Sequence, residues 1–129
     1  MSTPEFFNPP TVHAPLGLYS HGGVVRAGSE IVHIAGQVGT RPDGTLPESI
    51  REQAEEAFAN VVRVLAAREM AAANLVKINI YVVMGQPADP IRAARVRHFG
   101  EHRPASTFVY VPQLVDAKYL IEVEVVAVR

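Results

Sequence analysis

This sequence of 129 residues contains no cysteine and no tryptophan, and it carries no excess of charge of either sign. Without cysteine, disulfide bonds, thiolate metal sites and cysteine nucleophiles are excluded. Lysine and arginine together number 12 against 13 aspartate and glutamate residues, so the net charge is −1. This balance argues against nucleic acid as a general partner, because such binding requires a basic surface.

Long apolar runs are also lacking. No stretch of about 18 apolar residues occurs, so we expect no membrane span. The first ten residues do not combine a basic region with an apolar one, so we expect no signal peptide and a cytoplasmic location. The composition, 48% hydrophobic and 19% charged, is typical of a globular protein. The length predicts one domain over residues 1–129.

The residues that are present predict strands and two helices. Runs rich in Val and Ile predict strands at 24–26, 30–38, 75–83, 106–111 and 119–128. A Ser-x-x-Glu capping box at 49–52 opens one helix, whose apolar positions are Ile50, Ala54, Ala57, Phe58, Val61, Val64 and Leu65. Asp89 as the cap, followed by Pro90, opens a second helix that ends near Gly100.

The order of these elements predicts an α+β fold, a sheet with both helices on one face. Residues 27–29, Ala-Gly-Ser, indicate a hairpin between the first two strands, and the proline-rich segment before them indicates an extended arm. The other face of the sheet keeps some apolar character, which favours association of several copies of the chain.

Two glutamates interrupt the apolar pattern of the last predicted strand. Alternation places Ile121 and Val123 on one face and Glu122 and Glu124 on the other. A buried charge without a partner costs several kcal/mol, so these carboxylates must reach water or find partners. The strand alone supports two interpretations equally: a solvated face of the sheet, or a carboxylate that lines a cleft.

An ordered series of short motifs resembles the RidA/YjgF family, whose members are also called L-PSP endoribonuclease-like. The motifs are Pro-Leu-Gly-Leu-Tyr-Ser at 15–20, Ile-Ala-Gly-Gln-Val at 34–38, Asn-Val-Val-Arg-Val-Leu at 60–65, Val-Lys at 76–77, Pro-Ala at 104–105 and Ile-Glu-Val-Glu-Val-Val-Ala at 121–127. The resemblance implies a chorismate-mutase-like fold, with a mixed sheet and two helices on one face. It also implies a homotrimeric barrel with clefts between subunits.

The same resemblance implies an activity and some site residues. Described members of the family hydrolyse small imines or enamines, as 2-iminobutanoate/2-iminopropanoate deaminases, without a metal or organic cofactor. Glu122 matches the glutamate that holds the water, and a carboxylate in a cleft can also move a proton toward departing ammonia. Tyr19 matches a tyrosine at the cleft edge, although core packing explains it equally well. Gly36 matches a glycine that a ligand approaches, although a β-bulge is an equal alternative.

The sequence departs from the deaminases of this family at the substrate side of the site. Ser106 and Thr107 follow Pro-Ala, where the deaminases have an arginine that binds the substrate carboxylate through two hydrogen bonds. Ala35 stands where they have serine. Arg92, Arg95 and Arg103 are possible replacements for the arginine, with solvated surface charges as the favoured interpretation.

Histidines add a second possibility for acid–base chemistry. His21, close to Tyr19, and His33 on the neighbouring strand are candidates for a partner of Glu122. The five histidines show no spacing typical of a zinc site, so no metal is predicted. The predicted site therefore consists of Glu122 and Tyr19 as catalytic residues and Gly36, Ala35, Ser106, Thr107, Arg92, Arg95 and His21 as substrate-binding residues.

Two functions of different classes follow. The first is a hydrolytic deaminase for a small imine or enamine that lacks the usual carboxylate or carries it elsewhere. The second is a non-catalytic trimeric protein that binds a small ligand or mediates an interaction. Cleavage of RNA is disfavoured, because the charge is nearly neutral and no pair of histidines is evident.

Overall fold

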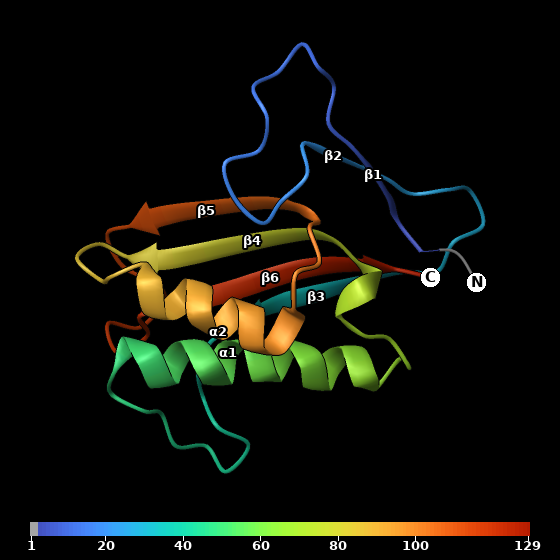
Figure 1. Cartoon of the computed structure of the whole chain (residues 1–129). Helices are drawn as coiled ribbons and strands as arrows, with labels where there is room; N and C mark the ends of the chain where they lie inside the picture. The colour runs from blue at the N-terminus through green and yellow to red at the C-terminus, as the bar shows by residue number, and fades with distance from the viewer. Residues whose placement is uncertain (1–2) are drawn as a thin grey trace.

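The computed structural model describes residues 3–129, and both helices lie on the same side of its main sheet (Figure 1). The α+β architecture predicted from the sequence is confirmed. The elements in chain order are β1 (Glu5–Phe7), β2 (Gly22–Val24), β3 (Ile31–Gln37), α1 (Ile50–Ala66), the short 3-10 helix η1 (Ala72–Asn74), β4 (Leu75–Val83), α2 (Asp89–Phe99), β5 (Ala105–Val111) and β6 (Ile121–Val128).

The main sheet has four strands in the order β3-β6-β4-β5. Strand β6 is antiparallel to both of its neighbours, whereas β4 and β5 are parallel. Parallel neighbours need a crossover connection, and α2 provides it between β4 and β5. Strand β5 therefore forms one edge of the sheet, beside the helix that precedes it.

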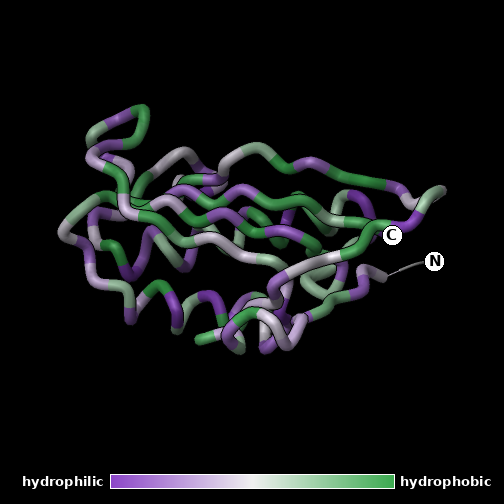
Figure 2. Tube along the Cα trace, turned by 90° about the horizontal axis from the view of Figure 1, so that it is seen from above, coloured by the Kyte–Doolittle hydropathy of each residue, from purple (hydrophilic) through white to green (hydrophobic). Residues whose placement is uncertain are grey.

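The core forms where the helices meet the sheet. From β6, Ile121, Val123 and Val125 are buried, and in the register of the sheet they lie opposite Val82, Ile80 and Ile78 of β4. The residues between them, Glu122 and Glu124 among them, project to the face without helices. Hydrophobic and hydrophilic residues alternate along the strands as a result (Figure 2).

Helix α1 begins where the sequence predicts it. The Ser49 side chain accepts a hydrogen bond from the backbone N–H of Glu52 at 3.2 Å, which satisfies one of the free donors of the first turn. Of the predicted apolar face, Ala54, Ala57, Phe58, Val61 and Leu65 are buried and Ile50 packs against the core. The prediction for Val64 is wrong, since this residue is 37% exposed.

Helix α2 differs slightly from its prediction. Asp89 is its first residue, and the cap position falls on Ala88, which offers no side-chain hydrogen bond. Asp89 therefore does not act as the cap. The helix is tied to α1 by Glu55, which accepts a hydrogen bond from Arg97 Nε at 2.6 Å and shares another with His98 Nε2 at 2.7 Å.

The N-terminal segment also differs from its prediction. Strand β2 pairs with β1, with Phe6 opposite Gly23, so the segment before β2 contains a strand and is not only an extended arm. Strand β3 pairs with β6, so the predicted hairpin between the first two strands is wrong. A turn at 27–29 reverses the chain, but it is burial of Ile34 beside Val125 that places β3 in the main sheet.

Neither helix in the described part of the chain has the length and apolar character needed to cross a bilayer.

Candidate functional site

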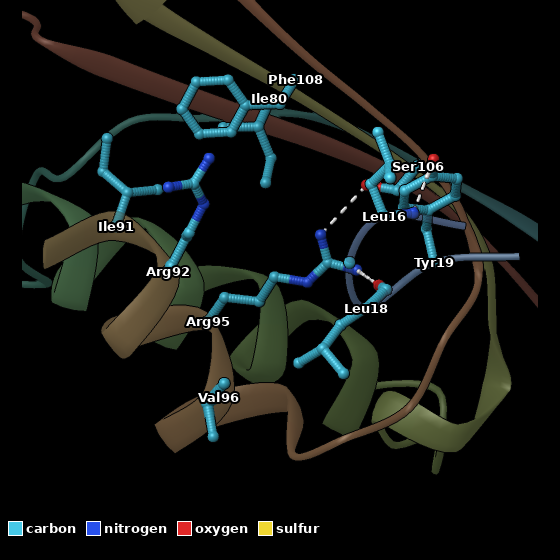
Figure 3. A pocket seen from close by; sticks show the side chains of 11 residues that line it. Leu16, Leu18, Tyr19, Ile80, Ile91, Arg92, Arg95, Val96, Ser106 and Phe108 are labelled. Carbon is cyan, nitrogen blue, oxygen red and sulfur yellow. Dashed lines mark hydrogen bonds between the residues drawn. The ribbon is translucent and has the colours of Figure 1, made fainter. Parts of the chain in front are cut away.

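A cavity of about 680 Å³ lies between α2, the edge strand β5 and the loop at 16–19 (Figure 3). Its apolar lining includes Ile80 and Ile91, which are buried, together with Phe108 of β5. Its polar lining comes from two arginines of α2, from Ser106 and from Tyr19. The complete lining is Leu16, Gly17, Leu18, Tyr19, Ile80, Ile91, Arg92, Arg95, Val96, Ser106 and Phe108.

Arg95 is the central polar group of this cavity. Its Nη1 donates a hydrogen bond to Ser106 Oγ at 3.0 Å, and its Nη2 donates one to the Leu18 carbonyl oxygen at 2.6 Å (Figure 3). Burial lowers the pKa of the Arg95 guanidinium. Arginine nevertheless stays protonated at neutral pH because its ordinary pKa is so high. Within residues 3–129 no carboxylate pairs with Arg95.

The loop at 16–19 is fixed to β5 by its neighbour Ser20. The Ser20 hydroxyl donates to the Arg103 carbonyl oxygen at 2.6 Å, and its backbone N–H donates to the Pro104 carbonyl oxygen at 3.1 Å. Inside the loop, the Tyr19 hydroxyl accepts a hydrogen bond from Leu16 N at 3.2 Å. These contacts hold Tyr19 and the Leu18 carbonyl against the cavity.

The other arginines considered from the sequence are less engaged. Arg92 lies at the rim of the cavity, where its guanidinium extends toward Phe108 (Figure 3). It is largely exposed, and it pairs with Asp89 at 3.6 Å. Arg103 is exposed, as expected of a surface charge. The interpretation as solvated charges therefore holds for Arg103 and fails for Arg95, which is half-buried and hydrogen-bonded.

Glu122 lies elsewhere, on the face of the sheet that the helices leave open. In the register of β4 and β6 it is opposite Tyr81. Its side chain occupies the space above Gly36, where a β-carbon would lie 2.6 Å from Cδ and 2.8 Å from Cγ of Glu122. Among the residues that the structure describes, none donates a hydrogen bond to this carboxylate.

Gly36 itself belongs to an irregular part of β3. The register with β6 shifts between Ile34 and Gln37, so Ala35 and Gly36 form a β-bulge. The bulge proposed as an alternative for Gly36 is therefore present. Because Gly36 has no side chain, the Glu122 side chain can occupy the space next to its backbone.

Glu124, two residues further along β6, is hydrogen-bonded to two side chains of β4 through its Oε1. It accepts hydrogen bonds from the Tyr81 hydroxyl at 2.5 Å and from Asn79 Nδ2 at 3.1 Å. The hydrogen bond to Glu124 raises the pKa of Tyr81, because it stabilises the protonated phenol. Glu124 thus links β6 to β4, and Glu122 is the free carboxylate of the pair.

The predicted site residues fall on two faces of the sheet. Ser106 is opposite Ile78, a core residue, so Ser106 faces the helices, whereas Glu122 is opposite Tyr81 and faces away from them. The cavity gathers Tyr19, Arg92, Arg95 and Ser106, and the open face carries Glu122, Gly36, Ala35 and Thr107. Thr107 accepts a hydrogen bond from Lys77 Nζ at 3.0 Å. A single chain therefore does not bring Glu122 and Ser106 together.

The candidate histidines are not partners of Glu122 within the chain. His21 contacts the ring of Tyr19 edge-on at 5.8 Å, and its Nε2 bonds to the His13 carbonyl oxygen at 2.6 Å. His33 is exposed opposite Val126, four positions from Glu122, which is about 13 Å along the strand. No group of three His, Cys, Asp or Glu within residues 3–129 is arranged to hold a metal ion.

Two parts of the cavity had no signal in the sequence. The Leu18 carbonyl is a backbone group, so no residue type marks it as a partner of Arg95. The packing of β5 beside α2 depends on tertiary structure and not on any motif. The available signal is the spacing of Arg92 and Arg95, three residues apart on one helix, which places both side chains toward the same region.

Comparison with known proteins identifies the class of protein. Residues 11–129 match the Endoribonuclease L-PSP family. The mitochondrial protein MMF1 of Saccharomyces cerevisiae is 32% identical over 120 residues, which cover 90% of this chain and 79% of that protein. The crystal structure of YyfB of Yersinia pestis, a Rid-family protein of unknown function, superposes with a TM-score of 0.85 at 28% identity and covers 98% of each chain. This chain therefore belongs to the RidA/YjgF family, as its sequence motifs indicate, and it has the fold of that family.

A further relative carries the name of an enzyme. The 2-iminobutanoate/2-iminopropanoate deaminase of Dermatophagoides farinae is 28% identical over 116 residues, which cover 88% of each protein.

Proposed function

We propose that this protein is a hydrolytic deaminase of the Rid type, which converts a small imine, or its enamine tautomer, into a carbonyl compound and ammonia. The observation that carries the proposal is the Glu122 carboxylate. It projects from the second residue of β6 and accepts no hydrogen bond from residues 3–129, although Glu124 on the same face accepts two. A relative that carries the name of an imine deaminase supports the same activity.

The reaction needs one carboxylate and one water. Glu122 accepts a proton from water as the water oxygen bonds to the imine carbon, and it passes that proton to the nitrogen, which gives a carbinolamine. Glu122 then takes the proton of the carbinolamine hydroxyl and delivers it to the nitrogen, so that the carbon–nitrogen bond breaks, ammonia leaves and the carbonyl forms. No redox change occurs, and the carboxylate returns to its starting state.

The active site in this proposal is formed between chains. Because Glu122 and the cavity lie on opposite faces of the sheet, the open face of one subunit must meet the cavity of a neighbour. The open face carries exposed apolar side chains that suit such contact, including Ile31, 49% exposed, and Val109, 37% exposed. The homotrimer that the family resemblance implies provides such interfaces by symmetry.

The test is ammonia release from imines that an amino-acid oxidase generates in the assay. We expect Glu122→Gln to lose about a hundredfold or more of the catalysed rate, the usual contribution of a general acid–base group. Glu101→Gln, which changes an exposed glutamate outside the site, is the matched control and should keep the wild-type rate. Equal rates for wild type and Glu122→Gln, both at the uncatalysed level, would exclude the deaminase.

One observation favours a second candidate, a non-catalytic protein that binds a small ligand. The residues that line the cavity do not include Glu122 of the same chain, so the cavity can hold a ligand without that carboxylate. This function predicts that a ligand raises the melting temperature without being consumed, and that Glu122→Gln leaves the shift unchanged.

A further inference from the structure

Arg95 reaches from α2 to residue 106 of β5, and both residues line the cavity. Residue 106 faces the cavity, and its short serine side chain accepts a hydrogen bond from Arg95 Nη1 at 3.0 Å. An arginine at position 106 would direct a second positive charge at the same place. The serine on β5 and the arginine on α2 are therefore complementary, and the cavity keeps one guanidinium.

The guanidinium of Arg95 retains capacity to bind an anion. Arginine has five N–H donors, and two of the Arg95 donors are used by Ser106 and Leu18. Throughout residues 3–129 no side-chain N or O atom is both buried and unpaired, so Arg95 Nε, which has no partner there, reaches solvent. A half-buried cation without a counter-charge is costly, and an anionic ligand removes that cost.

The rest of the cavity indicates what the anion carries. Ile80, Ile91 and Phe108 give it an apolar wall, and Leu16, Leu18 and Val96 add to it. No acidic residue lines the cavity, and Arg92 adds a second positive charge at the rim. Its volume of about 680 Å³ lies within the usual range for small-molecule sites. The chemistry that fits is a carboxylate attached to an apolar group.

We propose that Arg95, supplied by α2, is the carboxylate anchor of this protein, in place of the arginine that the family resemblance implies at position 106 of β5. The ligands are then 2-imino acids with an apolar side chain, and the 2-oxo acids that they yield. The carboxylate binds at Arg95 and Ser106, and the apolar side chain lies against Ile80 and Phe108. The imine part rests on the proposed deaminase function, whereas the binding of carboxylates does not.

The experiment measures binding by calorimetry, with 4-methyl-2-oxopentanoate as the probe and its methyl ester as the neutral counterpart. We expect the acid to bind wild type about tenfold or more tightly than the ester, since a charged hydrogen-bonded pair is lost in the ester. Arg95→Gln should weaken the acid by a similar factor and leave the ester unchanged. Arg95→Lys keeps the charge but loses the planar guanidinium, so its affinity for the acid should lie between those of wild type and Arg95→Gln.

Two controls make the result specific. Arg103→Gln removes an exposed arginine near the cavity and should bind both probes as wild type does. Pyruvate, which lacks the apolar side chain, should bind about tenfold more weakly than 4-methyl-2-oxopentanoate. Retained binding of the ester by Arg95→Gln shows that this variant keeps its cavity even though it loses the contact to Leu18. The assignment of Arg95 as the anchor is wrong if the acid binds wild type and Arg95→Gln with equal affinity. It is also wrong if wild type binds the acid no more tightly than the ester.

Failure of this inference can be told apart from failure of the deaminase. Binding of the acid should persist in Glu122→Gln, because the carboxylate is bound by Arg95 and Ser106 and not by Glu122. If the acid binds through Arg95 and no imine is hydrolysed, the anchor stands and the deaminase fails. If imines are hydrolysed and Arg95→Gln leaves KM unchanged, the deaminase stands and the anchor fails.

Discussion

The carboxylate of Glu122 lies directly above the Cα of Gly36, and the two residues come from neighbouring strands, β6 and β3. The bulge at 35–36 and the missing side chain of Gly36 together give Glu122 its place on the open face. Since that place fixes where a water could be held, the geometry of β3 bears directly on any chemistry of Glu122.

Gly36→Ala should displace Glu122 and leave the fold intact. The new methyl group would overlap the Glu122 side chain, which is only partly buried and can rotate away. We expect a loss of stability of about 1 kcal/mol, measured by urea denaturation, with a much larger loss of imine hydrolysis. In a Glu122→Ala background the same substitution should cost almost no stability. An equal cost in both backgrounds would show that the contact with Glu122 is not the reason.

Two variants that are each impaired should recover activity at low substrate concentration when they assemble together. In the proposed site, Glu122 comes from one chain and Arg95 from its neighbour, so a mixed oligomer of Glu122→Gln and Arg95→Gln chains contains some interfaces with both residues intact. Random assembly in a closed ring leaves both residues intact at about a quarter of all interfaces. Ammonia release after joint refolding of the two variants measures this. Recovery of no activity would place both residues of the working site in the same chain.

Gln53→Leu should destabilise the protein strongly. Gln53 is 1% exposed, and its amide donates to the carbonyl oxygens of Pro47 at 2.9 Å and Lys118 at 3.0 Å and accepts from Leu120 N at 2.9 Å. Leucine fits a similar volume but leaves three backbone groups without a partner, so we expect a loss of about 2–4 kcal/mol in chemical denaturation. Gln113→Leu, at an exposed position, is the control and should change stability very little.

The pKa of Tyr81 predicts a dependence of stability on alkaline pH. The hydrogen bond to Glu124 is the main cause that raises this pKa above its ordinary value of 10.0, and burial adds to it. Because the folded-state pKa exceeds the unfolded one, this stabilisation is complete below pH 10.0 and is lost as the pH rises through the folded-state value. Unfolding experiments across that range should show a steeper loss for wild type than for Tyr81→Phe.

The same pKa can be followed directly. Glu124→Gln removes the negative charge that opposes ionisation, so Tyr81 should then ionise at a lower pH. Phenolate absorbance reports the change, with Tyr81→Phe used to identify the contribution of this residue. An unchanged titration in Glu124→Gln would show that the hydrogen bond does not control Tyr81.

The sequence predicted which face of a strand or helix is buried better than it predicted which elements lie side by side. Alternation correctly separated Ile121 and Val123 from Glu122, because burial imposes a period of two residues on a strand. Helical spacing and the Ser49 cap correctly gave the start of α1 and most of its buried face. Both signals arise from local geometry and from the hydrophobic effect, and single residues carry them.

The pairing of elements has no comparable local signal. A hydropathy pattern states that a strand is half-buried but not which strand lies beside it, so the partner of β2 was predicted wrongly. For the same reason the sequence could not show that Ser106 and Glu122 face opposite sides, since that depends on the register of β4 with both neighbours. The meeting of Arg95 with Ser106 likewise depends on where α2 packs.

In the proposed site, the position of Arg95 on a helix, and not on a strand, ties ligand selection to the packing of the two helices. A side chain on β5 is held by the hydrogen bonds of the sheet, whereas Arg95 moves with α2. That helix is joined to α1 through Glu55, which binds both Arg97 and His98. Packed helices commonly shift past one another by about 1–2 Å when a protein changes conformation. If Arg95 anchors the ligand as proposed, a substitution at Glu55, which is outside the cavity lining, would therefore change which acids fit.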